Sequence, residues 1–384
     1  MTSPDTSSTE NTFEPRFVRN VVLKAIALFV LLNLLFAGLY PVQSLGHLSA
    51  YNHIFPGRLR LPYGENPSVA YNLSLYNLEA MFASQEISSA SKRQGEYRII
   101  LIGDSSTWGF LLPPGKTLAA SLNDLKLSLP DGRLLQAYNL GYPVMSLTKD
   151  LLILSYALRY EPDLIVWPLT LESFPYDKQL FPPLLQNNPE PVRALIKDFD
   201  LNLDPDSPQF VSQTIWDRTI IGSRRSLADL LRLQFYGVMW ATTGIDQDIP
   251  SSYTPRQEDL SADQDFHNLQ PPRLSANDLA FDVLAAGVVL AGNTPILFIN
   301  EPMFISHGEN SDIRYNFFYP RWAYDDYHNL MEETSIENGW QYIDMWDTID
   351  PSEFTNSAVH LSPEGTRQFA QAIGQAILSN YAQR

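Results

Sequence analysis

Residues 97–109 read YRIILIGDSSTWG, and this stretch decides the fold. Its first six residues, Tyr97–Ile102, are apolar apart from Arg98 and do not alternate, which predicts a strand buried on both faces, as in a parallel sheet. Gly103 allows a sharp turn at the end of that strand. Ser105 then stands where open α/β sheets bind their ligands, beyond the carboxyl ends of the strands.

The same alternation of apolar strands and amphipathic helices continues along the chain. It predicts a three-layer, doubly wound (flavodoxin-like) α/β domain with a parallel sheet of about five strands. The further expected strands are 134–140, 163–169, 295–300 and 341–345, and the expected helices are 76–90, 117–129, 147–160, 226–241, 276–291, 324–338 and 362–381.

The alternation breaks at residues 174–275, which hold several prolines and two polar stretches. We expect an inserted cap here, because loops of this length are usually functional or disordered. The predicted organisation is therefore a tail (1–20), an anchor (21–42), a connector (43–95) and a catalytic domain (96–384) that carries the insertion.

Residues 21–42 form an apolar run long enough to cross ~30 Å of hydrocarbon as a helix. Arg16, Arg19 and Lys24 lie at its start, and no further cation follows until Arg58. The positive-inside rule then predicts a cytoplasmic N-terminus, a single span through the lipid bilayer and an extracytoplasmic catalytic domain. A cleaved signal peptide is the rival interpretation, although Phe36–Leu39 is a poor cleavage site.

The 384 residues carry a formal net charge of −17 and no cysteine. An acidic chain argues against nucleic-acid binding, which needs clustered Lys and Arg. The absence of cysteine excludes disulfides, thiolate metal sites and cysteine nucleophiles. His307 and His328 lack the paired spacing of metal ligands, so we expect no metal and no cofactor. The oligomeric state is left open.

Ser105 needs a base to become a nucleophile, and His360, in SAVHLSPEG, is the candidate. Because His360 follows the fifth expected strand, it belongs to the same edge of the sheet as Ser105. The alternative interpretation is structural: Asp104 and Ser105 are good helix-capping residues, and a lone His is usually a surface residue. We include Asp104 as a supporting residue of the site.

Three segments resemble the sequence blocks of the SGNH, or GDSL-type, hydrolases: GDSSTWG at 103–109, YNLG at 138–141 and VHLSPEG at 359–365. The resemblance covers about residues 96–173 and 276–384 and implies the SGNH type of α/β fold. It implies an acyl-enzyme on Ser105 with His360 as base. It also implies an oxyanion hole built from the backbone N–H groups of Ser105 and Gly141.

The chain departs from that family at two positions. Glu172 stands where the family has an Asn that donates to the oxyanion, and an ionised carboxylate cannot donate. Asn300 is a candidate replacement, although it could equally cap a turn. Ser357 stands where the family has an Asp that orients the His, with Asn356 beside it. A backbone carbonyl or another carboxylate, such as Glu353 or Asp350, could hold the imidazole instead, and a Ser105–His360 dyad is the expected arrangement.

Residues 301–326 are rich in polar and aromatic side chains. Arg314, Tyr315 and Arg321 could grip an acidic or sugar-bearing substrate, or could simply pack the loop. The predicted function is an extracytoplasmic serine esterase that acts on an acyl ester or an acylated glycan. The alternatives are an O-acyltransferase that modifies a cell-envelope polysaccharide, and a disabled relative that only binds glycans.

Overall fold

The computed structural model describes residues 15–46, 48, 50–55, 78–83, 85–244, 249 and 254–382. Most of the predicted tail and the middle of the predicted connector therefore lie outside the described residues. The structure confirms the predicted parallel sheet, whose five strands lie in the order β2-β1-β3-β4-β5. All four neighbouring pairs are parallel. The strands are β1 (Glu96–Leu101), β2 (Leu134–Asn139), β3 (Leu164–Leu169), β4 (Ile296–Asn300) and β5 (Gln341–Asp344).

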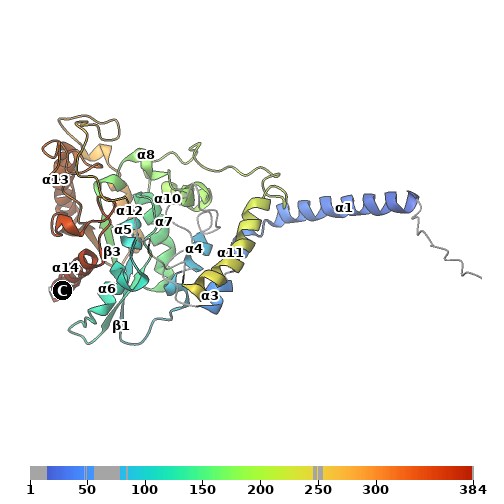
Figure 1. Ribbon diagram of the computed structural model, residues 1–384, viewed down its shortest axis with the longest axis horizontal. Coiled ribbons are helices and arrows are strands. Elements are labelled where there is room, and N and C mark those ends of the chain that lie inside the picture. Colours follow the sequence, from blue (N-terminus) through green and yellow to red (C-terminus); the bar gives the residue numbers. More distant parts are fainter. Residues whose placement is uncertain are drawn as a thin grey trace, which may run out of the picture.

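Helices cover both faces of the sheet, which gives the three layers visible in Figure 1. One face packs against α6 and α14, and the other against α7, α12 and α13. The helices are α1 (Pro15–Leu39), α2 (Val42–Gly46), α3 (Ala50–Ile54), α4 (Leu78–Ala83), α5 (Ser105–Trp108), α6 (Leu118–Asp124), α7 (Leu147–Ala157), α8 (Tyr176–Gln179), α9 (Pro183–Gln186), α10 (Pro189–Asp198), α11 (Arg224–Thr243), α12 (Phe281–Ala291), α13 (Arg321–Asn338) and α14 (Pro363–Ala382).

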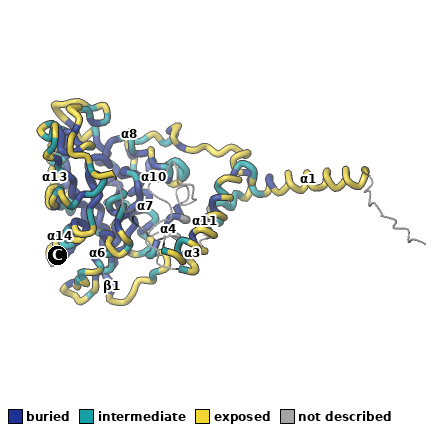
Figure 2. Tube along the Cα trace, in the orientation of Figure 1, coloured by how far each residue is buried: buried dark blue, intermediate teal, exposed yellow. Residues whose placement is uncertain are grey.

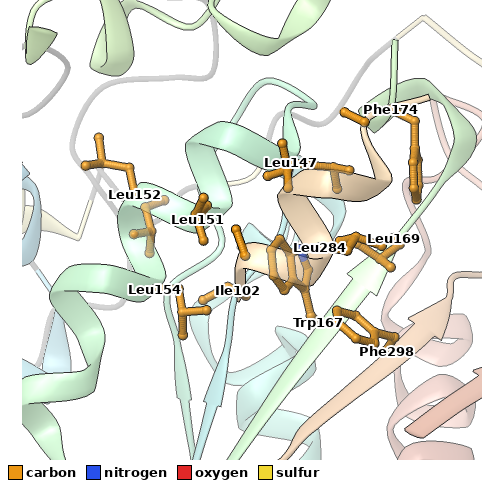
Figure 3. Packing of buried hydrophobic residues seen from close by; sticks show 14 of the residues in the cluster. Ile102, Leu147, Leu151, Leu152, Leu154, Trp167, Leu169, Phe174, Leu284 and Phe298 are labelled. Carbon is orange, nitrogen blue, oxygen red and sulfur yellow. The ribbon is translucent and has the colours of Figure 1, made fainter. Parts of the chain in front are cut away.

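Trp167, in the central strand β3, anchors the larger of the two cores (Figure 3). Its side chain is fully buried, and its ring centroid lies 5.7 Å from that of Phe298 in β4. Gly287 lets α12 approach this ring, since a Cβ at that position would lie 2.7 Å from the indole. Strands β1, β3 and β4 are buried along their whole length, as expected for strands covered on both faces.

The strand order fixes where a ligand can bind. In a 2-1-3-4-5 sheet the strand order reverses between β1 and β3, because the chain adds β2 on one side of β1 and the later strands on the other. The crevice beyond the carboxyl ends of β1 and β3 is the usual binding site. The segment that follows β1 is the one that begins α5, so Ser105 stands at this switch point.

The first part of the predicted insertion packs onto the rest of the domain. Helices α8 to α10 pack against α7, and Leu184, Leu185 and Val192 are fully buried in the larger core. Further along, Arg256 donates its backbone N–H to the carbonyl of Thr355 at 2.9 Å, in the loop that carries His360. Helices α8 to α10 and the segment at Arg256 are therefore tied to the rest of the domain.

Helix α1 projects from the domain, and almost all of its surface is exposed (Figure 2). It is long and apolar enough to span a membrane. Only Asn33 and Ala37 are buried, where the helix meets the domain.

Candidate active site

The turn that presents Ser105 is shaped by its neighbours. Gly103 has φ +150°, and a Cβ there would lie 2.5 Å from Thr107 Oγ1, so no larger residue fits. Asp104 caps α5, because its carboxylate accepts the Ser106 N–H at 2.8 Å. Ser105 is the first residue of that short helix and remains partly exposed.

His360 meets Ser105 across the end of the sheet, although 255 residues separate them in the chain. Ser105 Oγ lies 2.8 Å from His360 Nε2, and His360 Nδ1 lies 2.9 Å from Asn356 Oδ1. An amide oxygen can only accept, so Nδ1 carries the proton and donates it to Asn356. Nε2 is then free to accept the Ser105 proton, which is the arrangement that a general base needs.

Asn356, and not an acid, holds the imidazole. The expectation that Glu353 or Asp350 would do so is corrected, because Glu353 accepts a hydrogen bond from Ser362 Oγ and Asp350 caps the turn at Ser352. Asn356 reaches the ring because the loop bends back on itself, where Thr355 N–H donates to the carbonyl of His360 at 2.8 Å. The sequence places Asn356 beside the substituted Asp position, but its role as the acceptor follows only from the fold of this loop.

The imidazole of His360 is kept neutral. Burial lowers its pKa to about 4, and the nearby carboxylate of Asp104 opposes that shift. The ring of Phe110 covers it, with centroids 4.8 Å apart. The imidazole therefore stays in the form that can accept the Ser105 proton over a wide pH range, while its low pKa makes it a weaker base than an ordinary histidine.

The prediction that the Gly141 N–H donates to the oxyanion is wrong, because this N–H is bonded elsewhere. That N–H donates to Asn139 Oδ1 at 2.9 Å, while Asn139 Nδ2 donates to the carbonyl of Trp108. A Cβ on Gly141 would collide with the backbone of Thr107 and Trp108. Gly141 therefore allows two loops to pack closely, a structural role instead of the expected oxyanion contact.

Asn300 is also occupied, which corrects its expected role as an oxyanion donor. Its Nδ2 donates to Asp344 Oδ1 at 2.8 Å, and its Oδ1 accepts from the hydroxyls of Tyr324 and Tyr327 at 3.2 and 3.3 Å. The side chain is fully buried. It joins β4, β5 and α13 at the end of the sheet.

Glu172 is held as a carboxylate by the insertion. It accepts from Lys178 Nζ, and His267 Nε2 lies 3.3 Å from both of its oxygens. Burial raises its pKa, but the hydrogen bond to His267 and the charge of Lys178 outweigh that and lower the pKa below its ordinary value. An ionised Glu172 cannot donate to an oxyanion.

A buried polar cluster lies behind the nucleophile turn, and sequence reasoning did not find it. Lys149 Nζ is fully buried, 2.7 Å from the carbonyls of Gly103 and Tyr142 and 2.7 Å from Asp150 Oδ1. Glu301 accepts from Ser106 Oγ, and burial with the charge of Asp104 raises its pKa well above the ordinary value. Such a cluster fixes the turn rigidly.

The arginines of the loop at 301–326 hydrogen-bond to backbone carbonyls of the protein. Arg314 donates to the carbonyls of Asp263, Phe317 and Phe318, and Arg321 Nε donates to the carbonyl of Ser311. Their guanidinium groups therefore order the loop, and the packing interpretation describes them better than substrate binding.

No protein-family model matches the sequence, and no curated protein matches it at a significant level. Three solved structures are similar over 73% of this chain. The three are a putative arylesterase from Agrobacterium tumefaciens str. C58 (13% identity, 98% of its chain covered, TM-score 0.31), a carbohydrate acetylesterase family member from Sinorhizobium meliloti (12%, 99%, 0.31) and an inhibitor-bound aryl esterase from M. smegmatis (11%, 98%, 0.32).

Proposed function

We propose that this chain is a membrane-anchored serine esterase whose nucleophile is Ser105. The observation that carries the proposal is the relay Ser105 Oγ–His360 Nε2 at 2.8 Å with His360 Nδ1–Asn356 Oδ1 at 2.9 Å. Serine, base and orienting group stand in hydrogen-bond reach of one another, which is the arrangement that activated serine nucleophiles share. It lies at the switch point of the sheet.

In the proposed reaction Ser105 Oγ attacks the ester carbonyl carbon, and its proton passes to His360 Nε2. The imidazolium then gives that proton to the departing alkoxide, which leaves an acyl-enzyme and an alcohol. Water deprotonated by His360 attacks the acyl-enzyme and releases the carboxylic acid, while Ser105 regains its proton. Asn356 keeps the Nδ1 proton in place throughout both halves of the reaction.

The tetrahedral intermediate needs donors for its oxyanion. The backbone N–H of Ser105, at the first position of α5, is the donor we assign. The N–H of Gly141 and the amide of Asn300 are bound elsewhere, and Glu172 is ionised. We therefore expect a modest turnover rate, because this oxyanion hole has fewer donors than the resemblance implies and each donor removed typically costs about 10²–10³-fold in turnover.

We also propose that α1 crosses a membrane, with the catalytic domain on the extracytoplasmic side. The support is its exposed apolar surface and the cations Arg16, Arg19 and Lys24 near its N-terminal end. A substrate in this setting would be an acyl ester or an acylated glycan of the cell envelope.

The test uses the full chain in detergent micelles, a chromogenic acetyl ester and a fluorophosphonate probe. We expect turnover and labelling in the wild type, and loss of both in Ser105→Ala. His360→Ala should lower turnover by roughly 10³-fold or more. The matched control is Ser106→Ala, which removes the neighbouring hydroxyl and should still be labelled. Labelling that survives Ser105→Ala but not Ser106→Ala would refute the assignment.

A further inference from the structure

Six large apolar side chains are exposed beside the point where α1 joins the domain. Three lie in the turns before α11 and three on α11 itself, and we call them the lateral patch. Their exposed fractions run from 37% to 74%, so each leaves much of its surface uncovered. An exposed apolar area of this kind marks an interaction surface. The six are Ile215, Trp216, Ile220, Leu231, Phe235 and Met239.

Helix α11 has two apolar faces. Leu230, Leu233 and Gly237 are buried on the side that packs towards the domain. Leu231, Phe235 and Met239 follow one another at intervals of four residues, so they form a single stripe on another side. The buried face of α11 accounts for its packing on α3. The outer stripe is exposed, so packing within the domain does not account for its apolar side chains.

The turns that carry three residues of the lateral patch contact the proposed membrane span. Ile221 N–H donates to Asn33 Oδ1 of α1 at 3.2 Å, and the guanidinium of Arg218 lies over the ring of Tyr40 at 5.5 Å. Asn33 precedes Tyr40 by seven residues (40 − 33), which is ~10 Å along a helix at 1.5 Å per residue. The turns at 215–221 therefore lie beside the outer half of the span, from Asn33 near its middle to Tyr40 near its outer end, where Tyr and Trp favour the membrane interface.

The chemistry of this segment suits that position. Residues 211–243 hold four Arg and two Asp (4 − 2 = +2), in a chain whose net charge is −17. The backbone of the turns is satisfied locally, with Thr219 N–H bonded to the carbonyl of Trp216 and Gly222 N–H to Thr219 Oγ1. Apolar side chains flanked by arginines, over a satisfied backbone, are typical of segments that lie in the membrane interface.

We infer that the lateral patch lies in the outer interface of the bilayer, so that the domain rests on the membrane through α11 as well as hanging from α1. Figure 1 shows α11 running obliquely away from the end of α1. A tilt of the span towards α11 would bring the outer stripe to the lipid, and membrane-spanning helices tilt by ~20° on average. The inference rests on the proposed membrane span, and it gives the catalytic domain one fixed orientation.

The test exploits the absence of cysteine from the chain, which permits single spin labels without background. Full chains carrying Ile220→Cys, Phe235→Cys, Leu28→Cys or Ile336→Cys are labelled and reconstituted alone into phosphatidylcholine vesicles. Leu28 reports on α1, and Ile336, which is 74% exposed on α13, is the matched aqueous control. The readout is the ratio of collision rates with oxygen, which enters lipid, and with a charged nickel complex, which does not.

We expect labels at Ile220 and Phe235 to show a severalfold higher ratio than the label at Ile336. A label at Phe235 that matches Ile336 while Leu28 reports lipid would overturn the inference and leave the membrane span standing. That result would point to a protein partner for the patch. A label at Leu28 that reports water would overturn the span, and the inference with it.

Discussion

The Nδ1 nitrogen of His360 lies 2.9 Å from the amide oxygen of Asn356, so a neutral group orients the base of this site. An amide fixes the imidazole tautomer as well as a carboxylate does, but it contributes no charge to stabilise the imidazolium that forms during attack. The geometry of a serine relay is thus complete while one of its usual electrostatic supports is absent.

This relationship predicts different effects for two substitutions at one position. Asn356→Ala removes the orienting acceptor and should lower kcat/KM by roughly 10–10²-fold, within the range that positioned acid–base groups supply. Asn356→Asp places a negative charge against the ring and should move the acid limb of the pH–rate profile upward. Ser357→Ala, at the neighbouring position, is the control and should change neither property. Equal losses of kcat/KM in Ser357→Ala and Asn356→Ala would contradict the role of Asn356.

The pH dependence of activity follows from the burial of His360. Because burial lowers the pKa of the imidazole to about 4, the base stays neutral at higher pH, and activity should fall only as pH drops towards that value. Asp104→Asn keeps the cap on α5 but removes the charge that raises this pKa. The acid limb should then shift to lower pH, and kcat/KM should fall because a less basic imidazole abstracts the Ser105 proton more slowly. An acid limb near the ordinary histidine pKa of about 6.5 would contradict this reasoning.

Lys149 is expected to be the most sensitive position for stability. Lys149→Met removes the donor to the carbonyls of Gly103 and Tyr142 and leaves Asp150 buried without its cation. Breaking one side of a buried ion pair typically costs ~3–5 kcal/mol. Adding Asp150→Asn to Lys149→Met should recover part of that loss, which a double-mutant cycle of urea unfolding would measure. A strictly additive cycle would show that the two groups are not coupled.

The contact between the insertion and Glu172 should depend on pH. His267 hydrogen-bonds two carboxylates, and these bonds raise its pKa against the effect of burial. The imidazole therefore stabilises the fold below its unfolded pKa of 6.5, and this contribution is lost as pH rises through the folded pKa. The pKa of Glu172 is lowered, so its contribution is lost instead as pH falls through its folded value. His267→Gln should therefore flatten the alkaline decline of thermal stability. A melting profile between about pH 6 and 9 that is identical to that of the wild type would contradict this.

The sequence could predict the sheet because its strands are apolar without alternation and its helices are amphipathic, and both patterns are local. Helix α6 shows the limit: the pattern extends to residue 129, but the helix ends at Asp124, just before Lys126 adopts φ +49°. Element boundaries depend on such turns, which the hydrophobic pattern does not specify.

What the sequence by itself determined is the pairing of Ser105 with His360, because each follows a strand and parallel strands end at one edge of the sheet. Tertiary structure alone decided the partners that surround them. Asn356 meets the imidazole only because its loop bends back, and Lys149 reaches the nucleophile turn only because α7 packs behind it. The amides of Gly141 and Asn300 are bound by groups that no spacing rule identifies. Strand ends are set by local pattern, whereas hydrogen-bond partners are set by the packing of distant segments.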